Sequence, residues 1–347
     1  MRKESGQAVV IVAFLMVALF GFAALSIDIG SLVARRESLQ KAADAAALYG
    51  ATVAPGDNWD QGTVTGQVDG FLQSEYGIPA SETTVALNQG NQTVSVSVTG
   101  TYPLHLATVI GISSAVITRS ATAKMELPEV FDYALFSNED LNISNNQVYV
   151  NGNAHSNSNV NISTNNGYIN YVTEAHGVIN LSYLHFQTNT LENAPYINMP
   201  DFSTQMLQQA EQLGQVYYTD YNINSNNCTI NGTIYVYGNV NISTNNIKGN
   251  GSIFATGDIN IDTNNASFGS GYIAYYSEHQ INVSTNNLTG NGVLYAPNGV
   301  INISANNISI SDGAIVGQGI NLSANTLEIV SSNLTDYALP RTAYLTN

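Results

Sequence analysis

The acidic side chains of the second half of the chain are the first candidates for chemistry. Two carboxylates about 5–9.5 Å apart can hydrolyse a glycosidic bond, and Asp258 and Asp262 belong to one repeat unit. Strand alternation puts them on different sides of a strand pair, and the neighbouring repeats offer Asn rather than acids. Beyond residue 125 the only bases are Lys248 and Arg341, too few for a lyase. We therefore expect no catalytic residues and no enzymatic activity.

Metal and nucleotide sites are not predicted either. The histidines of this half have no metal-ligand spacing with Cys or acids, so we expect polar surface residues, no metal and no cofactor; they are His155, His176, His185 and His279. Cys228 is the only cysteine, which excludes an intrachain disulfide and is typical of a small buried apolar residue. The glycine-rich corners lack a following Lys-Ser/Thr, so no phosphate cradle is expected.

Aromatic side chains in a row are the candidate binding site. The residue after the inward-facing Ile253 is Phe254, and the equivalent positions of other repeat units are also aromatic: Phe136, Tyr235 and Tyr295. Tyr272 and Tyr276 lie close to this row. Their faces suit sugar rings or a partner surface, so the predicted ligand- or partner-binding residues are Tyr235, Phe254, Tyr272 and Tyr295. The alternative is that the segment Asp201–Gly214 lies over the row and buries it.

Charge restricts the partners. Only 10% of residues are charged, and the formal charge of −16 reflects a shortage of bases. Such a chain cannot neutralise phosphates, so nucleic acid is not an expected partner.

The element that would carry the aromatic row is a repeat. An apolar–Asn–apolar triplet recurs at a spacing of 19–22 residues, broken once by 42, with its Asn at positions 142, 161, 180, 222, 241, 260, 282, 302 and 321. Three short strands and three corners per unit predict a right-handed parallel β-helix of about nine coils over residues 128–347.

Residue types within the repeat predict its interior and its corners. Apolar side chains at matching positions should form one internal column: Ile234, Ile253, Ile273, Leu294 and Ile315. Asn pairs such as Asn245-Asn246 recur at one corner, where Asn tolerates a left-handed conformation and stacked amides can hydrogen-bond from coil to coil. Alternation points Asn241 outward, so its replacement is expected to cost little. The 42-residue gap, residues 182–220, is interpreted as a helical insertion.

Residues 52–127 read as a small mixed α/β domain. A helix is expected over Thr63–Tyr76, a hairpin from Val85–Leu87 and Thr93–Val98, and a last strand over Ala115–Lys124.

The N-terminal 51 residues are expected to form one extended helix. Ala8–Ile27 holds no charge, and twenty residues at about 1.5 Å each cover a bilayer core of about 30 Å. Arg2 and Lys3 favour a cytoplasmic N-terminus, with the bulk exported. A cleavable secretory signal ending near Ser26 is the alternative.

This stretch resembles the N-terminal segment of TadE/TadG-like Flp pilus-assembly proteins. The matching features are the Glu4/Gly6 start, the apolar helix, Asp28-Ile29-Gly30, Arg35-Arg36 and the LQKAADAAALYGA ending. Ile11 stands where a pilin would carry Glu, which fits a TadG-like anchored protein better than a major pilin. The layout expected over residues 52–127 is similar to the extracellular part of these proteins, so the resemblance implies a small α/β pilin-like domain there. The solenoid is similar to bactofilin-like β-helices in repeat pattern alone.

Two functions follow from these observations. The first is a membrane-anchored structural or adhesive component of a Tad/Flp-type pilus or related surface apparatus, whose partners are the membrane and the surface-assembly proteins. The second is an envelope-anchored carbohydrate-binding or carbohydrate-active module, whose partners are surface glycans.

Overall fold

The computed structural model describes residues 4–54, 60–88, 90–104, 106–204, 208, 211, 215–331, 334 and 341–346. The chain forms two compact units. Unit 1 comprises Met1–Glu126 together with Arg341–Asn347, and unit 2 comprises Leu127–Pro340. The predicted solenoid boundary at residue 128 therefore lies close to the start of unit 2, whereas the last seven residues, expected in the solenoid, belong to unit 1.

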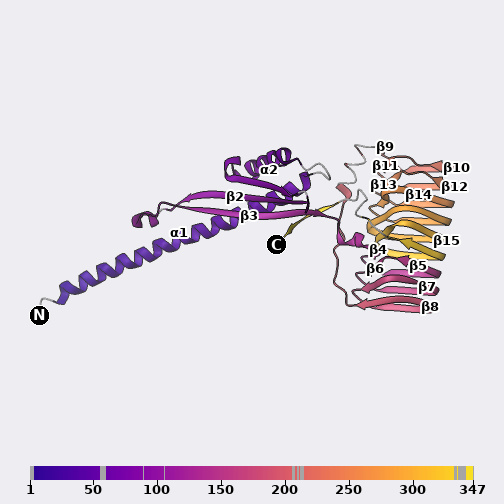
Figure 1. Ribbon diagram of the computed structural model, residues 1–347, viewed down its shortest axis with the longest axis horizontal. Helices are drawn as coiled ribbons and strands as arrows, with labels where there is room; N and C mark the ends of the chain where they lie inside the picture. The colour runs from indigo at the N-terminus through magenta and orange to yellow at the C-terminus, as the bar shows by residue number, and fades with distance from the viewer. Residues whose placement is uncertain are drawn as a thin grey trace. The chain divides into compact units, whose positions relative to one another are not determined.

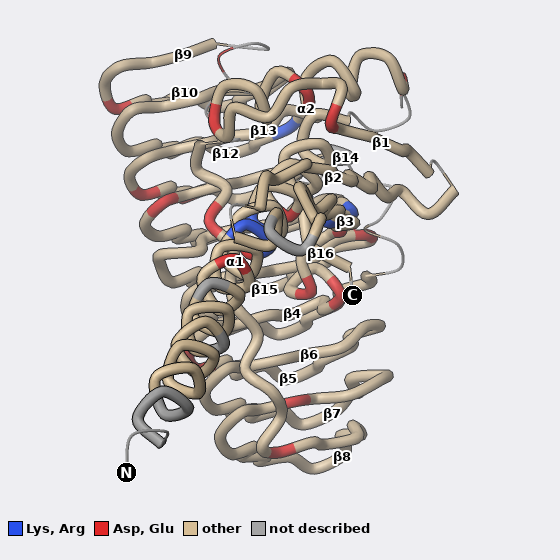
Figure 2. Tube along the Cα trace, turned by 90° about the vertical axis from the view of Figure 1, so that its left-hand side faces the viewer, with Lys and Arg blue, Asp and Glu red and all other residues tan. Residues whose placement is uncertain are grey.

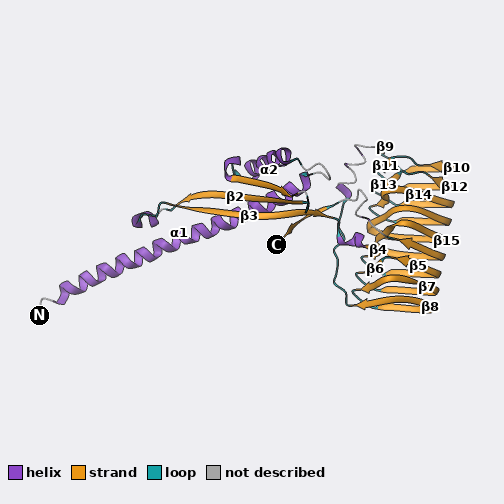
Figure 3. Cartoon of the chain, viewed as in Figure 1, coloured by secondary structure: helices purple, strands orange, loops and turns teal. Residues whose placement is uncertain are grey.

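One continuous helix opens unit 1, as the sequence predicts (Figures 1 and 3). Helix α1 spans Glu4–Val53, and its first half exposes apolar side chains such as Phe14 at 73%. In the second half an alanine stripe, with Ala43 and Ala46 fully buried, packs against the sheet of unit 1. The approach is close, since a Cβ on Gly50 would lie 2.8 Å from Val94 Cγ1.

The rest of unit 1 is a helix packed with an antiparallel sheet. Its elements are α2 (Gln61–Tyr76), η1 (Ala80–Glu82), β1 (Thr83–Asn88), β2 (Thr93–Pro103), η2 (Ala107–Ile110), β3 (Ser114–Glu126) and β16 (Thr342–Thr346). The sheet order is β1-β2-β3-β16. The predicted helix, hairpin and last strand are all confirmed. The C-terminal strand β16 was not predicted, because its pairing with β3 joins segments more than 200 residues apart.

Unit 2 is a parallel β-solenoid of about eight turns, one fewer than expected. Its elements are η3 (Glu129–Asp132), β4 (Tyr133–Ser137), β5 (Leu141–Asn151), β6 (Asn153–Ser156), β7 (Val160–Ala175), β8 (Ile179–Glu192), β9 (Gln215–Tyr217), β10 (Tyr221–Thr229), β11 (Thr233–Val236), β12 (Val240–Lys248), β13 (Ser252–Ala255), β14 (Ile259–Ser277) and β15 (Ile281–Val330). The triplets lie in register, as in the pairing of Asn241 with Asn260.

The internal column is as predicted at four of its five positions. Ile253 pairs with Tyr275 rather than with Ile273, because a register shift in β14 displaces the chain between Gly269 and Tyr275. Tyr275 therefore faces inward between Ile253 and Leu294, and it is 1% exposed. The longer coil that the sequence shows between Asn260 and Asn282 is the source of this irregularity.

The coils do not stack in the order of the sequence. β15 pairs with β4 and β5, so the last coil of the chain lies on the first one. β8 and β9–β10 consequently lie at opposite ends of the solenoid, as Figure 1 shows. The sequence suggested instead that the coil at Asn180 is followed by the coil at Asn222.

The predicted helical insertion over residues 182–220 is wrong. Residues 182–192 continue strand β8, and residues 215–217 form strand β9. Within this insertion the sequence predicts a helix over Asp201–Gly214, and most of that segment, residues 205–207, 209–210 and 212–214, lies outside the described residues. We call the described residues 193–204 the strap, since they run along the side of the stack toward the opposite end.

Candidate functional site

The aromatic row predicted as a binding surface is buried. Tyr235, Phe254 and Tyr295 are 3%, 4% and 0% exposed, in one cluster with Phe136 and Tyr276. In the register, Tyr276 continues the row between Phe254 and Tyr295. The fourth predicted residue, Tyr272, lies in the irregular part of β14, and its side chain is outside the described ones.

The strap covers this row. Phe202 is 3% exposed, and its ring lies 5.9 Å from that of Tyr295 and 6.2 Å from that of Phe131. The hydroxyl of Tyr295 donates a hydrogen bond to the carbonyl of Pro200. The alternative to a binding surface, a segment that covers the aromatic row, is therefore what the structure has. The covering segment is the strap, which begins before the predicted Asp201.

Polar side chains of the coils hold the strap in place. Asn157 accepts a hydrogen bond from the backbone N–H of Ile197 at 2.9 Å and donates one to its carbonyl at 2.6 Å. His155 contacts Asn157 Oδ1 at 3.0 Å and Glu174 Oε2 at 3.3 Å. His155 was expected at the surface, but it is fully buried, because its ring stacks on Phe136 beneath the strap.

A continuous ladder of amides runs along a different face of the stack, on the strands that carry the apolar–Asn–apolar triplets. The Asn of each triplet except the terminal Asn222 donates from Nδ2 to Oδ1 of the Asn in the adjacent coil. Eight hydrogen bonds of 2.8–3.0 Å join, in spatial order, Asn222, Asn241, Asn260, Asn282, Asn302, Asn321, Asn142, Asn161 and Asn180. A corner ladder is also present, as in Asn246 to Asn227 at 2.9 Å. Hydrogen bonding between stacked Asn side chains is thus confirmed.

Beside the ladder runs a column of exposed hydroxyls. Two positions after each ladder Asn the chain carries Ser144, Ser163, Ser182, Ser243, Ser284, Ser304 or Ser323, with Asn224 and Asp262 at the remaining two places. Among the described residues these serine hydroxyls have no hydrogen-bond partner. We did not predict this column, although the recurrence of Ser after the triplet is visible in the sequence.

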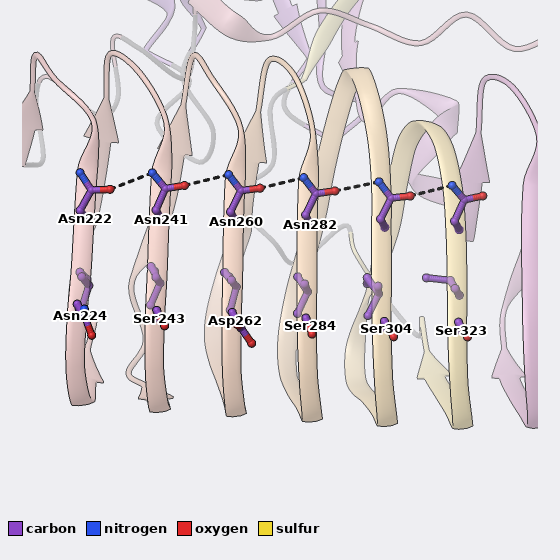
Figure 4. A pocket seen from close by; sticks show the side chains of 18 of the residues that line it. Asn222, Asn224, Asn241, Ser243, Asn260, Asp262, Asn282, Ser284, Ser304 and Ser323 are labelled. Atoms are coloured by element: carbon purple, nitrogen blue, oxygen red, sulfur yellow. Dashed lines mark hydrogen bonds between the residues drawn. The ribbon is translucent and has the colours of Figure 1, made fainter.

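The two columns line a groove along this face. Its larger part, of about 800 Å³, extends from Asn222 to Asn142, and Figure 4 shows the six coils from that of Asn222 to that of Ser323. A second hollow of about 530 Å³ continues the groove to Asn180. Among the described residues that line the two hollows, Asp262 is the only charged one. Charged residues are sparse along the stacked strands generally (Figure 2). The groove therefore presents neutral donors and acceptors on a surface that is otherwise largely apolar, which suits an uncharged ligand with hydroxyl or amide groups and apolar faces.

The titratable groups of unit 2 offer no activated nucleophile among the described residues. Burial raises the pKa of the Cys228 thiol and raises the pKa of Tyr235 to about 12. Burial likewise raises the pKa of Tyr276 and of Tyr295. Each of these shifts favours the neutral, less reactive form.

The acids and histidines considered for chemistry remain scattered. Asp258 lies at a corner, where its Oδ1 accepts a hydrogen bond from the N–H of Gln280 at 3.3 Å and lies 3.8 Å from His279 Nδ1. Asp262 faces the groove. Within the described part of the chain no three His, Cys, Asp or Glu residues are grouped to hold a metal ion.

Comparisons with known proteins identify the N-terminal segment. Residues 6–53 match the Tad family model, described as Flp pilus-assembly TadE/G-like. No curated protein and no solved structure matches the chain. The matched segment lies within α1, which is also long and apolar enough to cross a membrane. The chain therefore carries a TadE/G-like pilus-assembly domain at residues 6–53, followed by a small antiparallel sheet and a parallel β-solenoid.

Proposed function

We propose that this protein is a membrane-anchored structural and adhesive component of a Tad/Flp-type pilus or related surface apparatus. The observation that carries the proposal is the pairing of a TadE/G-like apolar helix with a solenoid built as a rigid stack. The exposed apolar half of α1 is stable in a lipid bilayer and costly in water. The N-terminus is cytoplasmic in this proposal, and both the sheet of unit 1 and the solenoid lie outside the membrane.

The solenoid serves as a spacer and contact face rather than as an enzyme. Its coils are tied by backbone pairing, by a filled core and by the amide ladder, all of which favour rigidity. The groove offers repeated neutral hydrogen-bonding groups, and its described lining residues include no pair of acids and no base. Such a surface supports adhesion and not bond cleavage.

A second candidate is an envelope-anchored carbohydrate-binding module. The observation that favours it is the column of unpartnered hydroxyls beside the amide ladder, since each ladder Asn retains one N–H and one lone pair for a ligand. A linear neutral glycan laid along the groove would meet equivalent groups at every coil, at intervals of about 4.8 Å.

Membrane fractionation and attachment assays test the two candidates together. Full-length protein should sediment with membranes, and cells with Ser243→Trp and Ser284→Trp, which obstruct the groove, should lose surface attachment. A matched control is Thr289→Trp, because Thr289 is exposed but outside the groove. Attachment unchanged in the groove variants would contradict an adhesive groove, and release of soluble protein beginning near Ser26 would contradict the anchor. Binding to a glycan array that depends on Ser243 and Ser284 would favour the second candidate.

A further inference from the structure

Both ends of the solenoid leave the hydrophobic core partly open. In β8 at one end, Ile179 and Leu181 are only partly buried, as are Tyr221 and Ile223 in β10 at the other. The equivalent residue of an interior coil, Ile259, is fully buried. An unpaired strand edge beside an open core is a surface that favours pairing with another strand.

The amide ladder gives the two ends opposite hydrogen-bonding character. Asn222, at the β10 end, uses only its Oδ1 in the ladder, by accepting from Asn241. Asn180, at the β8 end, uses only its Nδ2, by donating to Asn161. One end therefore offers a spare amide donor and the other a spare acceptor in the same column.

The interior of the solenoid already contains two coils that stack in register although they do not follow each other in the chain. The last coil of β15 stacks on β5 with ten aligned pairs, from Ile320–Leu141 to Val330–Asn151. No short connection joins these two coils, since 179 residues separate Asn142 from Asn321. Coils of this repeat thus stack in register without covalent continuity.

We propose that the solenoid associates head to tail with a second copy of this chain, β8 of one copy pairing in parallel with β10 of the next. Continuing the register aligns Ile179 with Tyr221 and Asn180 with Asn222 of the second copy. The amide ladder, the internal column and the groove then run on from one molecule to the next. Burial of the open core at each junction provides the driving force.

The path of the chain permits this association to repeat. The chain enters the solenoid at β4 and leaves it after Val330, and these two coils are neighbours at the internal join. The connections to unit 1 therefore leave from the interior of the stack, and neither end strand is the point of attachment. Both ends of one molecule can be occupied at once, which extends the association beyond a dimer.

One carboxylate keeps the association weak. Glu192 Oε1 accepts a hydrogen bond from the backbone N–H of Ile179 at 2.8 Å. In interior coils the equivalent N–H donates to a carbonyl of the next coil, as the N–H of Val240 does to the carbonyl of Asp258. Stacking must displace this carboxylate toward the corner that holds Asp220 of the second copy. Dilute protein therefore stays largely separate, whereas copies held in one membrane reach the local concentration that favours the junction.

Cysteine pairs across the junction test the proposal on the full-length protein in detergent. The native cysteine is first replaced by Cys228→Ala, which the solenoid should tolerate because Ala266 occupies the equivalent position two coils away. In this background the variant with Asn180→Cys and Asn222→Cys should form disulfide-linked multimers of increasing mass on oxidation. A stacked parallel pair brings the two Cα atoms within the range of about 4.4–6.8 Å that a disulfide requires. The matched control pairs Asn180→Cys with Asn302→Cys, which is in the same column but inside the stack.

Three outcomes are distinguishable. Multimers in the end-to-end variant alone, increased further by Glu192→Gln, are the expected result. Equal multimer formation in the control would show that collisions, not a junction, explain the linkage. A disulfide within one chain, seen as altered gel mobility without added mass, would mean that the two ends meet inside one molecule, and it would overturn the proposal. Circular dichroism of each variant checks that the solenoid is intact, and none of these readings depends on adhesion.

Discussion

Asn142 donates a hydrogen bond from Nδ2 to Oδ1 of Asn321 at 2.9 Å, across 179 residues of sequence. The bond is equivalent in geometry to that between Asn161 and Asn142, which are 19 residues apart. The ladder therefore passes without interruption from the coils before the strap to those after it. This relationship makes one solenoid from two segments of chain.

The ladder predicts that an outward-facing Asn matters for stability. Asn241→Ala removes a donor to Asn222 and an acceptor for Asn260, so we expect a loss of about 1–3 kcal/mol in the free energy of unfolding. The sequence alone suggested that this replacement costs little. Ser243→Ala, two residues away and without a side-chain partner, should change stability by less than about 0.5 kcal/mol. Denaturant titration of both variants measures the difference, and equal midpoints would contradict a role for the ladder.

A second prediction concerns the internal join. Both Nδ2 and Oδ1 of Asn145 are buried without a hydrogen-bond partner among the described residues. The next coil carries Thr164 at the aligned position. Thr164 donates from its hydroxyl to the carbonyl of Asn166 at 3.1 Å. Asn145→Thr should therefore stabilise the protein by about 1–3 kcal/mol. The reverse change, Thr164→Asn, is the control and should lower the melting temperature; a destabilised Asn145→Thr variant would refute this assignment.

The buried aromatic row predicts a structural cost rather than a binding defect. Tyr295→Ala should lower the free energy of unfolding by about 3–5 kcal/mol, because it leaves a cavity between the coil and the strap. Tyr295→Phe, which loses only the hydrogen bond to Pro200, should lower it by about 1 kcal/mol. Tyr218→Ala is the control, since that side chain is 76% exposed. A stable Tyr295→Ala variant with impaired attachment would instead restore the binding interpretation.

Alkaline pH should weaken unit 2. Burial raises the pKa of Tyr235 from 10.0 to about 12, and burial also raises the pKa of Tyr276 and of Tyr295. Between pH 10 and 12 the unfolded chain loses protons that the folded chain retains, so the stability from these groups is complete below pH 10 and falls as pH rises. Tyrosinate absorbance should rise together with the loss of circular dichroism. Tyr295→Phe should flatten the pH dependence, and ionisation well before unfolding would contradict the burial.

The fifth prediction concerns the residue that ends the apolar run of α1. Asp28 is 4% exposed, and its Oδ2 accepts hydrogen bonds from the N–H groups of Leu106 and Ala107 at 3.0 and 2.7 Å. Asp28→Ala leaves both donors without this acceptor, so hydrogen exchange at the two amides should accelerate in detergent. Asp28→Asn keeps a carbonyl acceptor and should retain most of the protection. Unchanged exchange in Asp28→Ala would show that the carboxylate does not hold η2 to the helix.

Elements with a local signal were predictable from the sequence. The long helix follows from an uncharged apolar run continued by strong helix formers, and the hairpin of β1 and β2 from alternation around a short turn. The repeat spacing indicated the parallel stack and the amide contacts between coils, because identical coils in register must bring identical side chains together. The TadE/G-like segment was visible in the same local way.

Only the tertiary structure decided which coil lies on which. Every coil presents nearly the same apolar–Asn–apolar edge above and below, so the sequence is equally compatible with Asn180 beside Asn222 and with Asn142 beside Asn321. The sequence also left open whether the aromatic row is exposed or covered, and the structure shows it buried beneath the strap as part of a hydrophobic core. Long-range closure of this kind depends on which arrangement buries the most apolar surface in three dimensions, and no spacing along the chain encodes it.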